Sequence, residues 1–296
     1  MKKMKILIAD ILLPGKNSDW KEGYELLYAL RNLGYECDIA GKNCVIPELD
    51  IPKIANNYDL ILITENYPID SRWEWWDWKE IKTPKLFWAI DAHIIDFRYW
   101  FKNVNMDYIA FNNPEDIIDY NLPNSFWLPY AASKKHGLIE YTNEKKRDIV
   151  FIGGLMEERK RLCDKFNIEC INAYGPDYIK EMQASKICFN HSMSYNKKAN
   201  INAKYFEILS SGSFMLTDYN ENFHKYVDYN EDIAKMFYYS DDDLGEKIKY
   251  YLENEEEREA IAKRAFDYIS QNHTWENRCE LILSEVEKIN NSKVIE

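Results

Sequence analysis

Short, continuous apolar runs alternate with segments of helical periodicity along the first half of the chain. The runs lie at 5–10, 35–39, 58–64, 85–90 and 107–111. The segment 20–33, between the first two runs, carries Tyr24, Leu27 and Leu30 at helical spacing and is followed by Gly34, which can end a helix. Strands that are apolar throughout and joined by crossovers are typical of parallel sheets covered on both faces. The first half is therefore predicted to be Rossmann-like.

The second half repeats this pattern. Apolar runs at 148–154, 186–190 and 214–217 have the length of strands, and 241–254 and 255–270 read as helices with charged outer faces. A polar stretch at 133–147 separates the halves and is predicted to be a linker. The pattern therefore predicts an α/β protein with two domains.

The segment 200–223 is the most informative part of the second half. Asn202 can cap a helix whose core positions are Phe206, Leu209 and Ser210, and Gly212 can close it in a left-handed turn before a strand. On that helix Lys204 and Glu207 share a face with Ser211. The charged pair is either an ordinary half-buried ion pair or part of a ligand site.

Composition narrows the function classes. The chain of 296 residues has a formal net charge of −12 and a pI near 5.1, which disfavours a chain-wide electrostatic grip on nucleic acid or an anionic membrane. Six cysteines without a C-x-x-C pair indicate reduced thiols in a cytoplasmic protein and no metal site. No apolar run approaches about 18 residues, so no membrane insertion is expected.

Acid and base candidates of the first half follow one predicted strand. Asp91 and His93 come directly after the run 85–90, and open α/β sheets place their chemistry at the carboxyl ends of strands. The alternative is a capping Asp and a packed His. As a metal pair, D-x-H has too few ligands nearby.

The stretch Trp73 to Trp78 holds four tryptophans in six residues. It is either an aromatic platform for a sugar or a base, or a helix wedged against its own domain or a dimer contact.

The sequence K-Y-F-E-I-L-S-S-G-S-F-M-L-T-D-Y at 204–219 resembles the nucleotide-sugar signature of GT-B glycosyltransferases, in particular the CgeB-like and group 1 families. The likeness covers 148–285 well and the first half by architecture alone. It implies two Rossmann-like domains facing a cleft: an acceptor domain at 1–135, a nucleotide-sugar domain at 147–272, and at 273–296 a helix and tail crossing back to the first domain. The element H-T-W-E-N-R at 273–278 is similar to the one that closes CgeB-like chains.

The resemblance also implies roles for single residues. Glu207 matches the carboxylate that holds both ribose hydroxyls, and Lys204 matches a basic position near the diphosphate. Gly153 and Gly154 match the turn that approaches the donor phosphates, with Arg159 as the first choice for the accompanying cation and Arg161 as the second. His191 and Asn202 complete the expected donor site. One departure is Ala199, which stands where many retaining relatives carry a further Glu.

The function that the resemblance implies is transfer of a sugar from a nucleoside-diphosphate sugar, without a metal or other cofactor and with retention of configuration. If configuration inverts, Asp91 is the candidate base. The acceptor is left open among glycan, protein, small molecule and nucleic-acid base. Two alternatives stand beside this interpretation: sugar transfer to a nucleic-acid base, and a non-catalytic binding protein with a GT-B frame, which the missing Glu at Ala199 favours.

Overall fold

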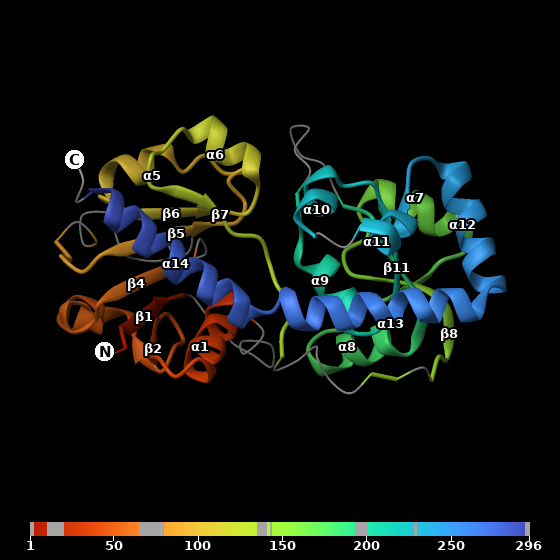
Figure 1. Cartoon of the computed structure of the whole chain (residues 1–296), viewed down its shortest axis with the longest axis horizontal. Coiled ribbons are helices and arrows are strands. Elements are labelled where there is room, and N and C mark those ends of the chain that lie inside the picture. The colour runs from red at the N-terminus through yellow and green to blue at the C-terminus, as the bar shows by residue number, and fades with distance from the viewer. Residues whose placement is uncertain are drawn as a thin grey trace. The chain divides into compact units, whose positions relative to one another are not determined.

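A computed structural model describes residues 3–10, 21–64, 78, 80–134, 141–142, 144–192, 200–227 and 230–293. The chain forms two compact units. The first contains the described residues before Tyr130 together with those from Trp275 onward, and the second contains the described residues from Tyr130 to Thr274. Figure 1 labels the elements of both units. The first five residues of the tryptophan-rich stretch, Trp73 to Asp77, lie outside the described residues.

The first unit is a seven-stranded parallel sheet in the order β3-β2-β1-β4-β5-β6-β7. Its strands are β1 (Lys5–Ala9), β2 (Glu36–Gly41), β3 (Ile46–Pro47), β4 (Leu60–Thr64), β5 (Lys85–Ala89), β6 (Tyr108–Phe111) and β7 (Ser125–Trp127). Its helices are α1 (Glu22–Asn32), α2 (Ile51–Ile54), α5 (Arg98–Asn103), α6 (Pro114–Tyr120) and α14 (Trp275–Lys293). The five apolar runs of the first half all became strands of this sheet.

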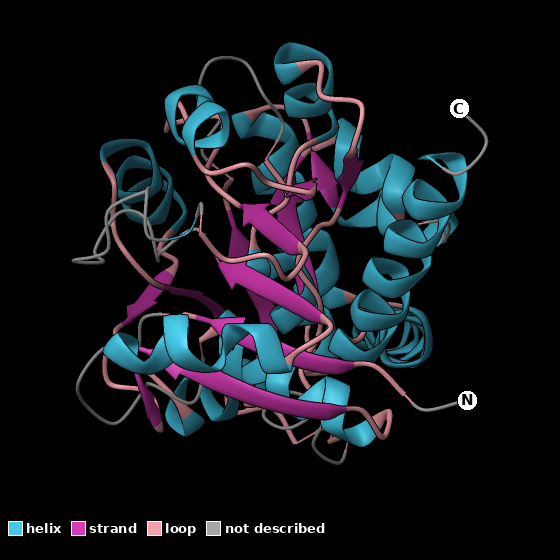
Figure 2. Cartoon of the chain, turned by 90° about the vertical axis from the view of Figure 1, so that its left-hand side faces the viewer, coloured by secondary structure: helices cyan, strands magenta, loops and turns pink. Residues whose placement is uncertain are grey.

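Both faces of this sheet are buried, as its continuous apolar strands predicted. Figure 2 shows the strands in magenta and the helices in cyan. Alternate residues of β4 and β5 point to opposite faces. On one face, Leu62 and Leu86 border a small cavity together with Leu26 of α1 and Ile282 of α14. On the other face, Ile61, Ile63, Phe87 and Ala89 belong to a core with Phe97 and Phe101.

The C-terminal helix α14 belongs to the first unit, although the chain enters it from the second. It packs along α1, and Arg278 Nε donates a hydrogen bond of 3.0 Å to the carbonyl of Pro129. Trp275 at its start meets Trp88 of β5 edge to face, with ring centroids 5.6 Å apart. The predicted return of the last helix to the first domain is confirmed.

The second unit is a five-stranded parallel sheet in the order β12-β11-β10-β8-β9. Its strands are β8 (Arg147–Ile152), β9 (Glu169–Ile171), β10 (Ser185–Asn190), β11 (Phe214–Asp218) and β12 (Phe237–Tyr238). Its helices are α7 (Glu157–Phe166), α8 (Pro176–Gln183), α9 (Ala203–Ser210), α10 (Glu221–Tyr226), α11 (Asn230–Met236), α12 (Asp241–Glu253) and α13 (Glu255–Asn272).

The connection from β9 to β10 reverses the direction in which this sheet grows, because β8 lies between these two strands. Ligands of open α/β sheets bind outside the carboxyl ends of the strands at such a point. The ends of β8 and β10 are therefore the expected ligand position of the second unit.

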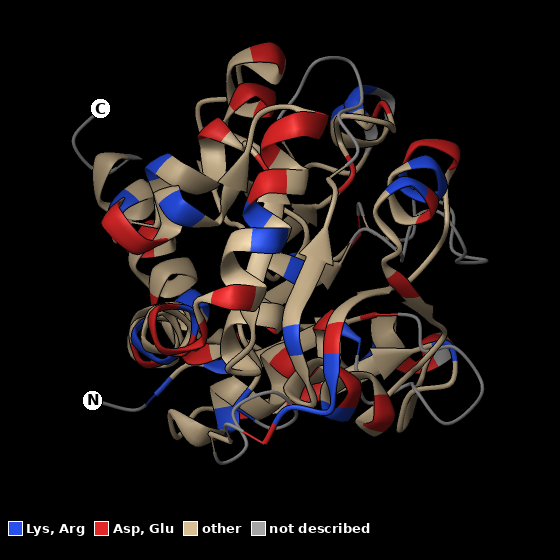
Figure 3. Cartoon of the chain, turned by 90° about the vertical axis from the view of Figure 1, so that its right-hand side faces the viewer, with Lys and Arg blue, Asp and Glu red and all other residues tan. Residues whose placement is uncertain are grey.

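Figure 3 marks the positions of Lys and Arg in blue and of Asp and Glu in red, and many of them lie on helices. Of the six cysteines, Cys37, Cys163, Cys188 and Cys279 are buried, as expected for structural thiols. None of the described helices combines the length and the apolar character that a membrane crossing requires.

Trp88 offers a test of how α14 is held. It is 2% exposed, and its indole N–H donates a 3.0 Å hydrogen bond to the carbonyl of Leu128. Trp88→Ala should lower the free energy of unfolding of the first unit by about 3–5 kcal/mol, because it leaves a cavity beside Trp275. Urea unfolding measures the loss. Val45→Ala, at a side chain 81% exposed, is the control and should change it by less than about 0.5 kcal/mol. A loss below about 1 kcal/mol for Trp88→Ala contradicts this packing.

Candidate functional site

Helix α9 presents Lys204 and Glu207 on the side that the core does not cover. The carboxamide oxygen of Asn202 accepts a 3.0 Å hydrogen bond from the backbone N–H of Lys204, so the predicted cap is present. Phe206, Leu209 and Ser210 are fully buried, and Gly212 has a φ of 77° in the predicted left-handed turn. Lys204 and Glu207 are only half-buried.

Lys204 reaches across to the end of β8. Its Nζ lies 4.5 Å from the ring centroid of Phe151, and a Cβ added to Gly153 would collide with Nζ. Gly153 has a φ of 138°, which also favours glycine. Glycine at 153 therefore makes room for the ammonium group, whereas a Cβ on Gly154 would meet open space.

Arg159 of α7 brings a second cation to the same ring. Its Cζ lies 5.6 Å from the Phe151 centroid, its Nε donates to the carbonyl of His191 at 2.9 Å, and its Nη1 donates to the carbonyl of Gly154 at 3.3 Å. These two backbone contacts join the loops that follow β8 and β10. Arg159 thus lies at the predicted ligand position of this sheet.

The ammonium group of Lys204 lies in an unfavourable electrostatic environment, because it is partly buried and has a second cation near it. Burial, and secondly the charge of Arg159, lower the pKa of Lys204 to about 8 from its ordinary 10.5, while Glu207 opposes the change. Among the residues that the structure describes, no carboxylate oxygen lies within 4.0 Å of Lys204 Nζ. A bound anion would relieve both effects.

Glu207 is held by a residue that sequence reasoning missed. The hydroxyl of Tyr178, on α8, donates to Glu207 Oε2 at 2.7 Å. Burial and the neighbouring carboxylate raise the pKa of Tyr178 well above its ordinary value, so it stays a donor. The bond fixes one carboxylate oxygen, and no sequence signal links two residues 29 positions apart.

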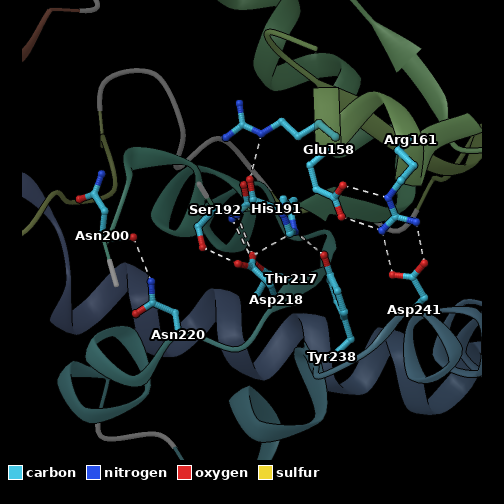
Figure 4. Close-up of polar contacts among 12 residues, drawn as sticks. Glu158, Arg161, His191, Ser192, Asn200, Thr217, Asp218, Asn220, Tyr238 and Asp241 are labelled. Atoms are coloured by element: carbon cyan, nitrogen blue, oxygen red, sulfur yellow. Dashed lines mark hydrogen bonds and ion pairs between the residues drawn. The ribbon is translucent and has the colours of Figure 1, made fainter. Parts of the chain in front are cut away.

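Asp218 organises the loop after β10 (Figure 4). Its carboxylate accepts hydrogen bonds from the backbone N–H and the hydroxyl of Ser192, both at 2.7 Å, and from Thr217 Oγ1 at 3.2 Å. The ring of His191 stacks on Tyr238, with Nδ1 2.6 Å from the phenol oxygen. These contacts hold the His191 carbonyl where Arg159 donates. The T-D pair of the signature was the only sequence signal for Asp218.

Arg161 does not join this group. Its guanidinium bonds to Glu158 at 2.6 Å and to Asp241 at 2.7 Å, as Figure 4 shows, and it lowers the pKa of Asp241. Arg159, the first choice, is therefore the arginine beside Gly154 and His191, and Arg161 belongs to a surface ion-pair network.

Asp91 and His93 lie in the first unit, at the carboxyl end of β5 as predicted. The backbone carbonyl of Asp91 accepts from the N–H groups of Ile94 and Ile95, and its side chain is half-buried. His93 is 3% exposed, with Nδ1 3.2 Å from the side-chain nitrogen of Asn113. His93 is thus a packed histidine, and Asp91 is the more accessible of the two.

All seven residues predicted for the donor site lie in the second unit: Gly153, Gly154, Arg159, His191, Asn202, Lys204 and Glu207. Ala199 lies outside the described residues. Within the described ranges, no group of three or more His, Cys, Asp or Glu side chains is arranged to hold a metal ion.

Comparison with solved structures identifies the fold. A DNA complex of an α-glucosyltransferase with UDP matches with a TM-score of 0.75 at 12% identity, over 96% of this chain and all of that one. The DNA-modifying enzyme β-glucosyltransferase matches with a TM-score of 0.67 at 13% identity, over 96% and 100% of the chains. The β-glucosyltransferase of phage T4 with UDP-glucose gives 0.66 at 12% identity, over 96% and 99%.

Sequence comparison identifies the second unit. Residues 147–284 match the family model described as glycosyl transferase-like, and no curated protein matches the chain. The matched range contains every residue of the predicted donor site. The protein therefore has the GT-B fold, as its sequence predicted, and its residues 147–284 are similar to glycosyl transferases.

Proposed function

We propose that the protein is a glycosyltransferase that binds a nucleoside-diphosphate sugar on its second unit and transfers the sugar to a hydroxyl group. The observation that carries the proposal is the pair of cations, Lys204 and Arg159, beside Gly153 with no carboxylate within 4.0 Å of Lys204 among the described residues. A diphosphate supplies the missing negative charge. Solved structures of similar fold contain UDP or UDP-glucose, which makes UDP the first nucleotide to test.

In this proposal the two cations also serve catalysis. When the bond between sugar C1 and the diphosphate oxygen breaks, the leaving diphosphate gains negative charge, and Lys204 and Arg159 stabilise it from fixed positions. They take the place of a metal, so transfer is expected to need none. The acceptor oxygen bonds to C1, and the hydroxyl proton passes to the departing diphosphate.

Glu207 is proposed to bind the ribose, with Tyr178 as the residue that orients it. Two adjacent hydroxyls donate well to one carboxylate, and a carboxylate with one oxygen held by a phenol is ready for them before the donor arrives. This arrangement differs from a Lys204–Glu207 ion pair inside the domain, because Glu207 has Tyr178 as a partner.

A nucleic-acid base is a second candidate acceptor, since the α-glucosyltransferase of similar fold was solved with DNA and the β-glucosyltransferase is a DNA-modifying enzyme.

The ribose role of Glu207 predicts a double-mutant result. Glu207→Gln should weaken UDP binding by about 1.5–3 kcal/mol, the range for hydrogen bonds to a charged group. Tyr178→Phe should weaken it by roughly 3- to 10-fold and reduce the preference of the protein for UDP over 2′-deoxy-UDP. The double mutant should lose less UDP-binding free energy than the two single mutants lose in sum. The difference should be about 0.5 kcal/mol or more, because both changes act on one carboxylate. Calorimetric titration measures all four proteins.

Tyr174→Phe is the control for these variants, because Tyr174 precedes α8 and is 67% exposed. Melting temperatures measured without nucleotide separate binding from folding. The ribose role is wrong if Glu207→Gln binds UDP like the wild type, if the wild type binds 2′-deoxy-UDP equally well, or if the only effect is a lower melting temperature.

The lowered pKa of Lys204 predicts how UDP affinity depends on pH. UDP is fully ionised above about pH 7, whereas the free protein loses the Lys204 charge as the pH rises through about 8. The affinity should therefore fall by roughly twofold between pH 7 and 8 and by up to about tenfold per unit above pH 8. Lys204→Met should bind UDP more weakly at pH 7, with little change up to pH 9. A wild-type affinity that stays constant to pH 9.5 contradicts the diphosphate role.

Retention of configuration is the proposed stereochemical course, and Asp91→Asn tests it. A reaction in which the departing diphosphate accepts the proton needs no side-chain base, so this variant should keep at least a tenth of the turnover. An inverting reaction with Asp91 as base should lose roughly 100- to 10,000-fold. Proton NMR of the anomeric centre of the first-formed product gives the configuration directly, and an inverted product overturns the proposal.

A further inference from the structure

Two exposed tyrosines lie side by side where β11 and β12 end. Tyr219 follows Asp218, the last residue of β11, and Tyr239 follows Tyr238, the last residue of β12. Their rings are stacked, with centroids 5.2 Å apart and planes inclined by 29°. Tyr219 is 42% exposed and Tyr239 67% exposed. We call this pair the tyrosine ledge.

The ledge is held in place before any ligand arrives. The backbone N–H of Tyr219 donates to the carbonyl of Tyr238 at 3.1 Å, and that of Tyr239 donates to Asp243 Oδ2 at 2.9 Å. The rings of Phe237 and Tyr219 pack edge to face, with their planes at 79° and their centroids 5.2 Å apart. Single exposed aromatic residues are common on protein surfaces, whereas a supported pair of stacked rings offers a fixed flat surface for another ring.

The ledge is joined to the candidate donor site. Asp218 binds Ser192, and Tyr238 binds the ring of His191, so each residue of the ledge directly follows one that holds the loop after β10. Arg159 donates to the carbonyl in that same loop. The ledge is therefore at the carboxyl edge of the sheet, the edge on which the nucleotide is proposed to bind.

The charge around the ledge selects between ligand classes. Residues 218–243 contain eight Asp and Glu and only two Lys or Arg. Both cations of the segment are paired, Lys225 with Glu221 at 2.6 Å and Lys235 with Glu257 at 3.2 Å. Cations from other segments pair with two of the acids, Arg264 with Asp232 and both Arg161 and Lys165 with Asp241, and the acids still outnumber the cations. Such a segment repels a polyphosphate backbone, which proteins attract with unpaired Lys and Arg. Carboxylates beside an aromatic face instead suit a neutral ligand that offers hydroxyl donors.

We propose that the tyrosine ledge binds a pyranose ring of a neutral saccharide, and that this saccharide is the acceptor, held on the second unit and not only on the acceptor domain at 1–135 that the resemblance implies. The apolar C–H face of the ring packs on Tyr239, and its hydroxyls donate to neighbouring carboxylates such as Asp243, which already accepts from the backbone N–H of Tyr239. The role of the saccharide as acceptor rests on the proposed transferase function, whereas the binding of a saccharide at the ledge does not. Because the segment is acidic, this surface does not suit a nucleic-acid acceptor.

The test is direct binding of neutral trisaccharides without any donor. Maltotriose, cellotriose and triacetylchitotriose are titrated into the full chain by saturation-transfer NMR. At least one should bind the wild type, Tyr239→Ala should weaken it by about 3- to 10-fold, and Tyr239→Phe should restore most of the affinity. Tyr174→Ala, at an equally exposed tyrosine of the same unit, is the matched control and should bind the trisaccharide like the wild type.

UDP titration of the same samples distinguishes the ledge proposal from the proposed transferase function. Tyr239→Ala should bind UDP like the wild type, so a loss of saccharide binding alone is assigned to the ledge. If the wild type binds trisaccharides but not UDP, the ledge stands and the proposed transferase function fails. The ledge proposal is overturned if no trisaccharide binds, if Tyr239→Ala binds one as tightly as the wild type, or if a single-stranded DNA 13-mer binds instead and Tyr239→Ala weakens it.

Discussion

Two positive charges beside one aromatic ring impose the constraint on which the second unit depends. Lys204 and Arg159 both lie near Phe151, and burial together with their mutual repulsion lowers the pKa of Lys204. Holding like charges together costs free energy, and within the described part of the chain Lys204 has no carboxylate close enough to form an ion pair. The surrounding structure must therefore hold the pair in place, and an anionic ligand would remove much of the cost.

The elements around this pair can be understood as its support. Gly153 leaves room for the ammonium, the capped start of α9 directs Lys204 to the end of β8, and the His191 carbonyl fixes Arg159. That carbonyl is itself held through Asp218, which binds the next residue of the loop. Four segments that are distant in sequence thus meet at the point where the growth of the sheet reverses, because parallel strands bring their carboxyl ends to one edge.

The fold and part of the site could be predicted because they depend on local pattern. Strands buried on both faces read as continuous apolar runs, and the cap at Asn202 and the turn at Gly212 are local features of α9. The contacts of Tyr178 with Glu207 and of Asp218 with Ser192 could not be predicted, because each joins residues more than 25 positions apart. Short elements such as β3 and β12, two residues each, carry too little pattern to be seen.

The sequence alone also could not decide which of two neighbouring arginines lies at the site. Arg159 and Arg161 are two residues apart on α7, so they face different directions on a helix. Only the structure shows that Arg161 pairs with Asp241 while Arg159 lies over Phe151. Likewise, the packed position of His93 beside Asn113 depends on the turn after β6, which the apolar run of β5 does not reveal.

The central claim is that the second unit binds a nucleoside diphosphate through its two cations. The most direct measurement is calorimetric titration of the full chain with UDP, UMP and uridine at pH 7.5, with EDTA and again with Mn²⁺. The account predicts a dissociation constant for UDP between roughly 1 µM and 1 mM, weaker binding of UMP, weaker still of uridine, and no effect of EDTA. Equal affinity for all three, or UDP binding that is lost with EDTA and restored by Mn²⁺, would contradict it.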